Sequence, residues 1–174
     1  MTPPNGPRVL NVGAGGQTLT EWGRKGFQVV TLDIAPENNP DIVADMCNMG
    51  DIGEFEAVYS SHSLEHLYPH QVSQALSEFR RVLKVGGVVT IMVPDLEDVR
   101  PDGRVLGIAE SGPISGLHLF YGDPRLIPIQ PFMAHHCGFI ADTLAEALKE
   151  AGFKDVMTQR LPGYNLLGAG IKRD

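Results

Sequence analysis

The chain has 174 residues, 43% of them hydrophobic and 20% charged, which is the balance of an ordinary globular protein with room for a buried core. Its formal net charge of −7 argues against a nucleic-acid substrate, because phosphate binding usually requires a basic face. No apolar run approaches the roughly 20 residues that span a bilayer, and the first segment, MTPPNGPR, lacks the apolar stretch of a signal peptide. The two cysteines, Cys47 and Cys137, suggest neither a disulfide framework nor a CxxC metal site, so we expect a cytoplasmic protein without a membrane partner.

The first half of the chain alternates between apolar runs and glycine-rich or polar segments. Runs typical of strands cover residues 8–12, 27–32, 41–44 and 55–59, and a weak helical pattern covers residues 17–25. The clearest helix follows Pro69, where apolar residues recur at helical spacing: Val72, Ala75, Leu76, Phe79, Val82 and Leu83. We expect Gly86 and Gly87 to end this helix, before a strand over residues 88–93 whose composition predicts burial on both faces.

Residues 95–134 break this alternation, because they are dense in proline and glycine. Short helical turns around residues 96–99 or 105–110 are the regular structure that we expect there. A connection of this length in a compact domain is usually a functional lid or disordered. The sequence therefore predicts one domain, residues 1–174, with a substrate-lid-like insertion at about residues 95–134.

The alternation resumes near the end of the chain. Thr143 and Glu146 fit a capping box at the start of a helix that Gly152 ends. Strands are expected over residues 153–158 and 164–171. Strands that alternate with helices predict an α/β fold with a parallel sheet and right-handed crossovers.

Glycines and polar residues gather at the predicted carboxyl ends of four strands, where an open parallel sheet binds its ligands. Gly13 and Gly15 follow the first strand, Asp33 ends the second, Asp45 follows the third, and residues 60–62 follow the fourth. The interval from Gly13 to Asp33 is 33 − 13 = 20 residues, the spacing expected of a ribose-binding acid. The glycines alone fit a plain tight turn and Asp33 alone fits a solvated acid, but together they favour a nucleoside cofactor.

The glycine pattern also separates two cofactors. A dinucleotide fingerprint, G-x-G-x-x-G, requires a third glycine, and Thr18 stands in its place. S-adenosylmethionine (SAM) has no pyrophosphate and does not need that glycine or an anion site at the helix start. The pattern therefore favours SAM over NAD.

These residues resemble the motifs of the class I SAM-dependent methyltransferases along nearly the whole chain outside the insertion. The similar segments are VLNVGAGG (9–16), LDIAP (32–36), DIVADM (41–46), FEAVYSSHSLEHL (55–67), EFRRVLKVGGVVTIMVPD (78–95), HHCGF (135–139) and LAEALKEAGF (144–153). The resemblance implies a Rossmann-like, doubly wound, mostly parallel seven-stranded sheet flanked by helices, with an antiparallel last strand.

The resemblance further implies a SAM site at these strand ends. Asp33 would hold the ribose hydroxyls, Asp45 would accept from the adenine amino group, and His62 would lie near the transferred methyl. The residues implied to bind the cofactor are Asn11, Gly13, Ala14, Gly15, Asp33, Ile34, Asp45, Met46, Ser60, Ser61 and His62.

Three features depart from the family pattern. Asn11 replaces an acidic residue that is common there, Gln17 replaces a glycine, and no helix precedes the first strand. One side of the SAM site is then poorly covered, unless the insertion or a second subunit covers it. A homodimer is therefore one hypothesis.

Methyl transfer from a sulfonium depends mainly on alignment, and a base is needed only if the acceptor must lose a proton. We single out His62 and His135 as catalytic candidates because imidazole titrates near neutral pH, although each can instead be a packed histidine. The other side chains considered are Glu65, His66, His118, Tyr121 and His136. We expect no metal, because His118, His135, His136 and Cys137 lack the regular spacing of metal sites.

The leading hypothesis is a SAM-dependent methyltransferase that acts on an unidentified small-molecule acceptor. The alternative is a non-catalytic SAM-binding or protein-interaction module with the same fold. An NAD-dependent oxidoreductase, against which the missing glycine weighs, and a SAM enzyme of another reaction type also remain open, because a fold does not fix a function.

Overall fold

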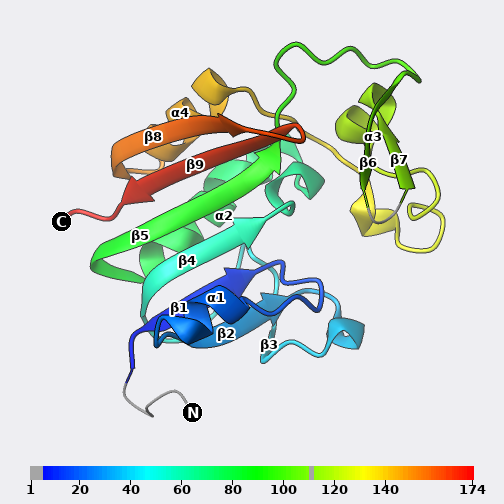
Figure 1. Ribbon diagram of the computed structural model, residues 1–174. Helices are drawn as coiled ribbons and strands as arrows, with labels where there is room; N and C mark the ends of the chain where they lie inside the picture. The colour runs from blue at the N-terminus through cyan, green and yellow to red at the C-terminus, as the bar shows by residue number, and fades with distance from the viewer. Residues whose placement is uncertain (1–5, 110–111) are drawn as a thin grey trace.

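The computed structural model describes residues 6–109 and 112–174, and its centre is a seven-stranded sheet in the order β3-β2-β1-β4-β5-β9-β8 (Figure 1). Its strands are β1 (Arg8–Val12), β2 (Gln28–Asp33), β3 (Ile42–Val43), β4 (Phe55–Ser61), β5 (Leu83–Pro94), β8 (Lys154–Leu161) and β9 (Asn165–Ile171). Strands β1 to β5 pair in parallel, while β9 pairs antiparallel with both β5 and β8. This confirms the predicted Rossmann-like sheet with an antiparallel last strand.

Helices cover the two faces of the sheet unequally. The α-helices are α1 (Thr20–Arg24), α2 (Pro69–Val82), α3 (Gly116–Tyr121) and α4 (Ala141–Glu150), and the 3-10 helices are η1 (Pro36–Asn38), η2 (Leu64–His66) and η3 (Pro131–Met133). Figure 1 shows α2 and α4 behind the sheet and the short α1 in front of it. None of the described helices has both the length and the apolar character needed to cross a membrane.

The main core lies between the sheet and the pair α2 and α4. Phe79 of α2 and Leu144 and Leu148 of α4 are fully buried there. Helix α4 packs so closely on β9 that a Cβ atom on Gly168 would lie 2.7 Å from the Leu144 side chain. The predicted apolar stripe after Pro69 is thus confirmed as the face that α2 buries.

Three expectations about these elements are wrong. Strand β5 is not buried on both faces, since Val88 is 37% exposed and its alternate residues face the thinly covered front of the sheet. Helix α2 ends at Val82, before the glycines, and β5 begins at the next residue. Helix α4 begins at Ala141, so Thr143 is its third residue, where its hydroxyl oxygen accepts a hydrogen bond from the Ile140 N–H at 3.1 Å.

The segment expected as a lid contains a separate hairpin, β6 (Val105–Ala109) with β7 (Gly112–Ser115), followed by α3 (Figure 1). The helical turn expected at residues 105–110 is therefore wrong for residues 105–109, and residue 110 lies outside the described residues. Residues 96–99 form a turn closed by a hydrogen bond from Val99 N–H to the Leu96 carbonyl at 3.2 Å. Figure 1 shows this segment projecting from the sheet beyond the carboxyl ends of its parallel strands.

Candidate cofactor and acceptor site

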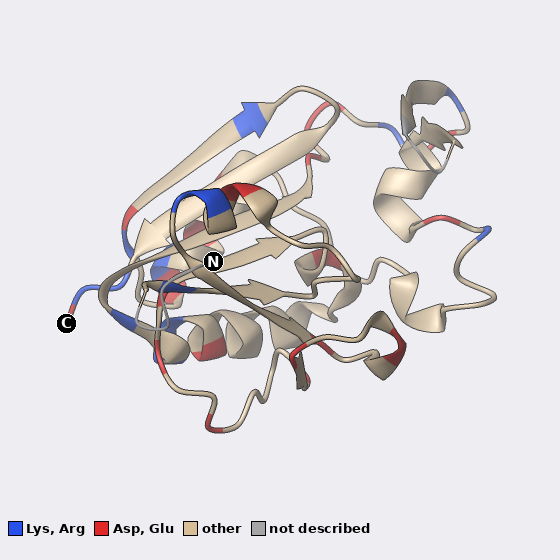
Figure 2. Cartoon of the chain, turned by 60° about the horizontal axis from the view of Figure 1, so that its bottom comes forward, with Lys and Arg blue, Asp and Glu red and all other residues tan. Residues whose placement is uncertain are grey.

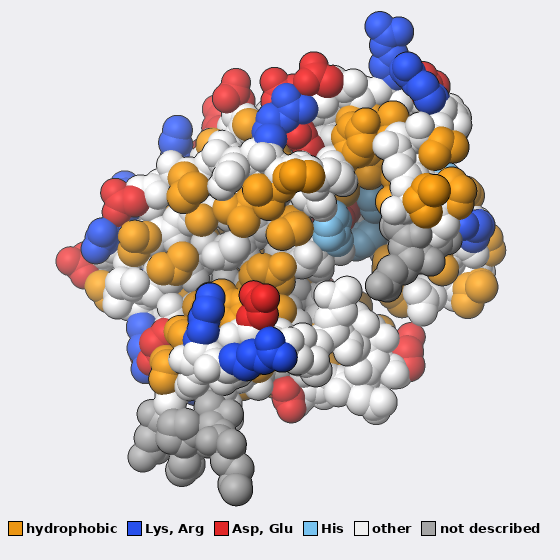
Figure 3. Space-filling model, viewed as in Figure 1, with side chains coloured by type: hydrophobic (Ala, Val, Ile, Leu, Met, Phe, Trp, Pro, Cys, Tyr) orange, Lys and Arg blue, Asp and Glu red, His pale blue; other side chains and the backbone are white. Residues whose placement is uncertain are grey.

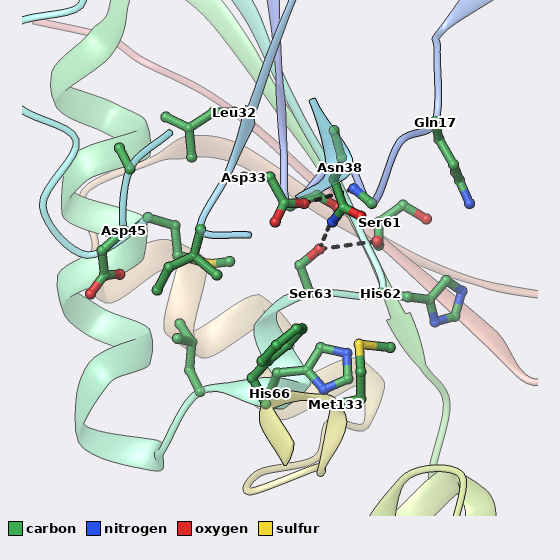
Figure 4. Close-up of a pocket in the computed structure, with 18 of the residues that line it drawn as sticks. Gln17, Leu32, Asp33, Asn38, Asp45, Ser61, His62, Ser63, His66 and Met133 are labelled. Atoms are coloured by element: carbon green, nitrogen blue, oxygen red, sulfur yellow. Dashed lines mark hydrogen bonds between the residues drawn. The ribbon is translucent and has the colours of Figure 1, made fainter. Parts of the chain in front are cut away.

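A cavity of about 460 Å³ lies at the carboxyl ends of β1, β2 and β4 (Figure 4). The chain runs outward from β1 to β2 and β3, and then returns to β4 on the other side of β1. This change of direction is the switch point at which α/β sheets bind ligands. Nine residues of the predicted cofactor set line the cavity: Gly13, Ala14, Gly15, Asp33, Ile34, Asp45, Met46, Ser61 and His62.

The floor of the cavity is the turn after β1. Gly13 has a φ of +66°, in the left-handed region that favours glycine. Its N–H donates to the Leu32 carbonyl at 2.8 Å, which joins the turn to the end of β2. Ser63 lies against the other side of Gly13, and its hydroxyl donates to the Gly13 carbonyl at 3.3 Å. The turn is therefore held between the end of β2 and the loop after β4, with its backbone against the cavity.

Asp33 forms the wall at the end of β2 and is 6% exposed. Its Oδ2 accepts from Gly15 N–H at 2.7 Å and its Oδ1 accepts from Ala35 N–H at 2.9 Å. Each carboxylate oxygen has a second lone pair, so Asp33 can still accept from two further donors. Its position is set by the same glycine turn that forms the floor.

Asp45 and Met46 come from the turn after β3, on another side of the cavity. Asp45 Oδ1 accepts from Cys47 N–H at 2.8 Å, which fixes the turn and leaves the exposed carboxylate at the cavity wall. The carboxylates of Asp33 and Asp45 thus come from neighbouring strands, as the sequence predicts.

Two residues of the predicted cofactor set do not line this cavity. Asn11 is buried in β1, and its Nδ2 donates to the Gln17 carbonyl at 3.1 Å. This hydrogen bond ties β1 to the far end of the glycine turn and so stabilises the turn. Ser60 is 1% exposed, and its hydroxyl has no partner among the described residues. Side chains alternate along a strand, so Ser60 and its lining neighbour Ser61 face opposite sides of β4.

His62 lies where β4 ends and has a φ of +51°, uncommon for a residue with a side chain. Its Nδ1 lies 3.3 Å from Glu65 Oε1, and its Nε2 lies 3.0 Å from Asn165 Oδ1. Burial opposes protonation of this ring, but the Glu65 carboxylate and Asn165 outweigh burial and raise the pKa of His62. Backbone strain that persists in a native fold is concentrated at functional sites, so the backbone conformation of His62 indicates a functional role.

A second cavity of about 360 Å³ adjoins the first, and His62, His66 and Met133 line both. Figure 3 shows pale-blue histidines in the hollow between the sheet and the projecting segment. His135 lines the second cavity and is absent from the wall of the first. Burial lowers the pKa of His135, although its ring also bonds to the Leu119 carbonyl. The two catalytic candidates therefore face one shared space, since both line the second cavity.

Of the remaining candidate side chains, Glu65, His66 and His118 line the second cavity, whereas Tyr121, His136 and Cys137 line neither cavity. His136 stacks on Tyr68, with ring centroids 4.2 Å apart, and Cys137 Sγ donates to the Leu64 carbonyl at 3.3 Å. His118 Nδ1 accepts from the Ser115 N–H at 3.0 Å, while Tyr121 is 58% exposed. Burial and Glu65 together raise the pKa of Cys137 to about 12.

Several wall residues of the first cavity were not predicted from the sequence: Gln17, Leu32, Asn38, Ala44, Ser63, Leu67, Gln71, Gln130 and Met133. Ser63 lies three positions after Ser60, and nothing in its local pattern predicts contact with Gly13. Gln130 and Met133 come from the projecting segment, whose path the sequence does not reveal.

The strand order, with five parallel strands and an antiparallel strand between β5 and β8, defines the Rossmann-like fold of class I methyltransferases. A sequence model described as a methyltransferase domain matches residues 2–158. The chain therefore belongs to this family, the class I SAM-dependent methyltransferases. A sequence search of curated proteins gives no match.

Solved structures have the same fold at low sequence identity. A SAM-dependent methyltransferase from Archaeoglobus fulgidus has a TM-score of 0.68 at 16% identity, over 97% of this chain and 87% of that one. A second similar structure is the 1,6-didemethyltoxoflavin-N1-methyltransferase of Burkholderia thailandensis with bound 1,6-didemethyltoxoflavin and S-adenosylhomocysteine. Its TM-score is 0.66 at 19% sequence identity, over 97% of this chain and 72% of that one. The SAM-dependent methyltransferase SibL in its apo form has 0.64 at 18% over 98% of this chain, which spans about half (51%) of SibL.

Proposed function

We propose that this chain transfers the methyl group of SAM to a small-molecule acceptor. The observation that carries the proposal is the pair of adjoining cavities, one lined by Asp33 and Asp45 and the other by His135, with a shared wall that includes His62. A donor in the first cavity and an acceptor in the second would meet at this wall. Alignment of the two at close approach supplies much of the rate of such a displacement.

The cofactor placement follows from the polar groups of the first cavity. In this proposal Asp33 accepts from both ribose hydroxyls through its remaining lone pairs, and Asp45 accepts from the adenine amino group. Met46 borders the adenine, while Gly13, Ala14 and Gly15 lie under the ribose and methionine. Ser61 offers backbone atoms to the methionine amine. Asn11 and Ser60 support the site from behind, since neither lines it.

In the proposed reaction the acceptor atom attacks the methyl carbon in line with the breaking C–S bond, and S-adenosylhomocysteine leaves. We assign His62 and His135 to contacts with the acceptor. His62 lines both cavities and His135 lines the second, so together they would position the acceptor. A base is required only for an acceptor that must lose a proton.

We propose that the projecting segment, about residues 95–134, is the lid of the acceptor site within a single domain. Ile114, His118, Asp123 and Leu126 of this segment line the second cavity. A small-molecule acceptor is also favoured over nucleic acid. Figure 2 shows Lys and Arg scattered among Asp and Glu without a broad basic face in that view, and the net charge is −7.

We further propose a homodimer and a cytoplasmic location. Figure 3 shows apolar side chains exposed over the front of the sheet. Val88 and Met157, which are 37% and 52% exposed, pair with Ile171 and Ala169 of β9 and so share one face of the sheet. A second copy packed on this face would bury them, and sedimentation of a monomer at micromolar concentration would exclude it. The two cysteines are free thiols, as expected in a reducing compartment, and cell fractionation tests the location.

The test of the function is isothermal titration of SAM and S-adenosylhomocysteine into the protein and its Asp33→Ala variant. Loss of two charge-assisted hydrogen bonds should weaken binding by about 100-fold or more. Glu37→Ala, an exposed acid of η1 that does not line the cavity, is the matched control. Folded protein that binds neither ligand would contradict the proposal, whereas binding without turnover of any acceptor would favour the non-catalytic module.

A further inference from the structure

Three metal-ligating side chains come together beside the shared wall of the two cavities. Glu65 and His66 belong to η2, and His135 comes from the chain after η3, 69 positions beyond His66 (135 − 66). One ligand atom from each lies within 4.8 Å of the other two, and no other such group occurs among the described residues. The sequence does not predict this set, because its spacing matches no metal motif.

The carboxylate of Glu65 is the unusual member of this cluster. Its side chain is 2% exposed, and its Oε2 is buried without a hydrogen-bond partner in the part of the chain that the structure describes. A buried carboxylate oxygen without a partner costs folding free energy, about 1–3 kcal/mol or more for a charged group. The other oxygen, Oε1, lies 3.3 Å from His62 Nδ1, so His62 leaves Oε2 unsatisfied. Oε2 is therefore able to bind a cation without giving up a contact to another described residue.

Both histidines are oriented as metal ligands are. His66 Nδ1 lies 3.2 Å from the Ala134 carbonyl, and His135 Nδ1 lies 2.9 Å from the Leu119 carbonyl. A carbonyl only accepts, so each Nδ1 must carry the proton, and each Nε2 keeps its lone pair. Metal-ligating histidines commonly donate their second ring N–H to a backbone carbonyl in this way. The two rings are edge to face, with centroids 5.0 Å apart.

We propose that Glu65, His66 and His135 bind one divalent transition-metal ion, with Zn²⁺ as the reference ion, at the floor of the acceptor cavity. Two imidazoles and one carboxylate are the ligand set of catalytic zinc sites that keep a fourth position open. Bonds of about 2.0–2.2 Å place tetrahedral ligands roughly 3.4 Å apart. Since the donor atoms lie within 4.8 Å of one another, they would close by at most about 1.4 Å on binding. All three residues line the second cavity, so the open position faces the acceptor.

The proposal rests on the proposed function for its chemical role. An acceptor hydroxyl or thiol that binds the ion would lose its proton to solvent more readily, since a cation stabilises the anion. The acceptor oxygen or sulfur would then form a bond to the methyl carbon, and the C–S electron pair of SAM would remain on sulfur. The products are the methylated acceptor, S-adenosylhomocysteine and one proton. The site thus selects acceptors with an ionisable hydroxyl or thiol.

The test is titration of Zn²⁺ into chelator-treated protein, in competition with a chromophoric chelator. We expect one ion per chain at sub-micromolar affinity, a loss of at least about 100-fold in Glu65→Gln and in His135→Gln, and visible absorption bands when Co²⁺ replaces Zn²⁺. His70→Gln and His136→Gln are controls, because they remove nearby imidazoles outside the cluster. Circular dichroism of each variant checks its fold.

Zn²⁺ affinity weaker than about 10 μM, or affinity that the Glu65 and His135 variants leave unchanged, would overturn the metal site. SAM binding is measured on the same samples. Because His135 does not line the first cavity, His135→Gln should retain SAM affinity while losing Zn²⁺. Failure of SAM binding with intact Zn²⁺ binding would overturn the proposed function alone.

Discussion

Ser63 and Gly13 are in such close contact that a Cβ atom on Gly13 would lie 2.2 Å from Ser63 Oγ and 2.6 Å from Ser63 Cβ. Rotation of the hydroxyl would not relieve this overlap, because the Cβ atom of Ser63 is part of it. The loop after β4 therefore presses on the turn after β1, and the floor of the first cavity depends on a residue without a side chain.

We predict that Gly13→Ala destabilises the fold by about 2–4 kcal/mol, the sum of left-handed strain and overpacking. Gly15→Ala is the matched control: its φ is +53°, but no atom of the described residues lies within 4 Å of the added Cβ. It should therefore cost about 1–2 kcal/mol, from strain alone. Urea denaturation of both variants measures the difference, and equal losses would contradict the packing explanation.

Gly23 offers a substitution in the opposite direction. It lies within α1, and a Cβ atom there would meet nothing within 4 Å. Gly23→Ala should stabilise the protein by about 0.5–1 kcal/mol, because alanine loses less backbone entropy in a helix. Gly26→Ala, just beyond the helix at a φ of +86°, should instead destabilise it by about 1 kcal/mol. Thermal melts distinguish the two, and stabilisation by both would refute the assigned end of α1.

Arg160 of β8 holds the buried carboxylate of Asp95 at the end of β5, with Nε 2.5 Å from Oδ2. Arg160→Met should lower the urea midpoint clearly, because Asp95 is 3% exposed and would lose its cation. Arg173→Met removes an exposed pair with Asp155 and should leave the midpoint nearly unchanged. Similar midpoints for the two variants would show that the Asp95 pair contributes no more than an exposed one.

The thiol of Cys47 should react slowly in the folded protein. Burial first, and then the nearby Asp45 carboxylate, raise its pKa from 9.0 to about 11. The thiolate fraction near pH 8 should then be about 100-fold below that of an ordinary thiol with the lower value. Iodoacetamide labelling of the Cys47 peptide, followed by mass spectrometry with and without urea, measures this. Equal labelling rates in the two conditions would be inconsistent with the raised pKa.

Much of the sheet could be predicted because its signals are local. The expected first strand, residues 8–12, coincides with β1, since an apolar run there ends in a glycine turn. The stripe from Val72 to Val82 is the buried face of α2 for the same reason. Asp33 and Asp45 line one cavity because parallel strands bring their carboxyl ends to one edge.

The rest depends on contacts between distant segments. The β6–β7 hairpin lies among prolines and glycines, which predict turns rather than a register of pairing. Ser60 and Ser61 are adjacent serines of one sequence motif, which does not distinguish their roles. The pleat of β4 buries Ser60 and turns Ser61 to the cavity. Glu65, His66 and His135 meet only because the chain after η3 returns to η2, through hydrogen bonds from His136 and Cys137 N–H to the Glu65 carbonyl.

The position of β9 between β5 and β8 has a consequence for folding kinetics. Strand β8 precedes β9 in the chain, yet it reaches the sheet only through β9, so it has no partner until residues 165–171 are available. During synthesis β5 would then present an unpaired edge, the kind of surface on which partly folded chains aggregate. Because this final hairpin adds β8 and β9 together, we expect the sheet to close in one late, cooperative step.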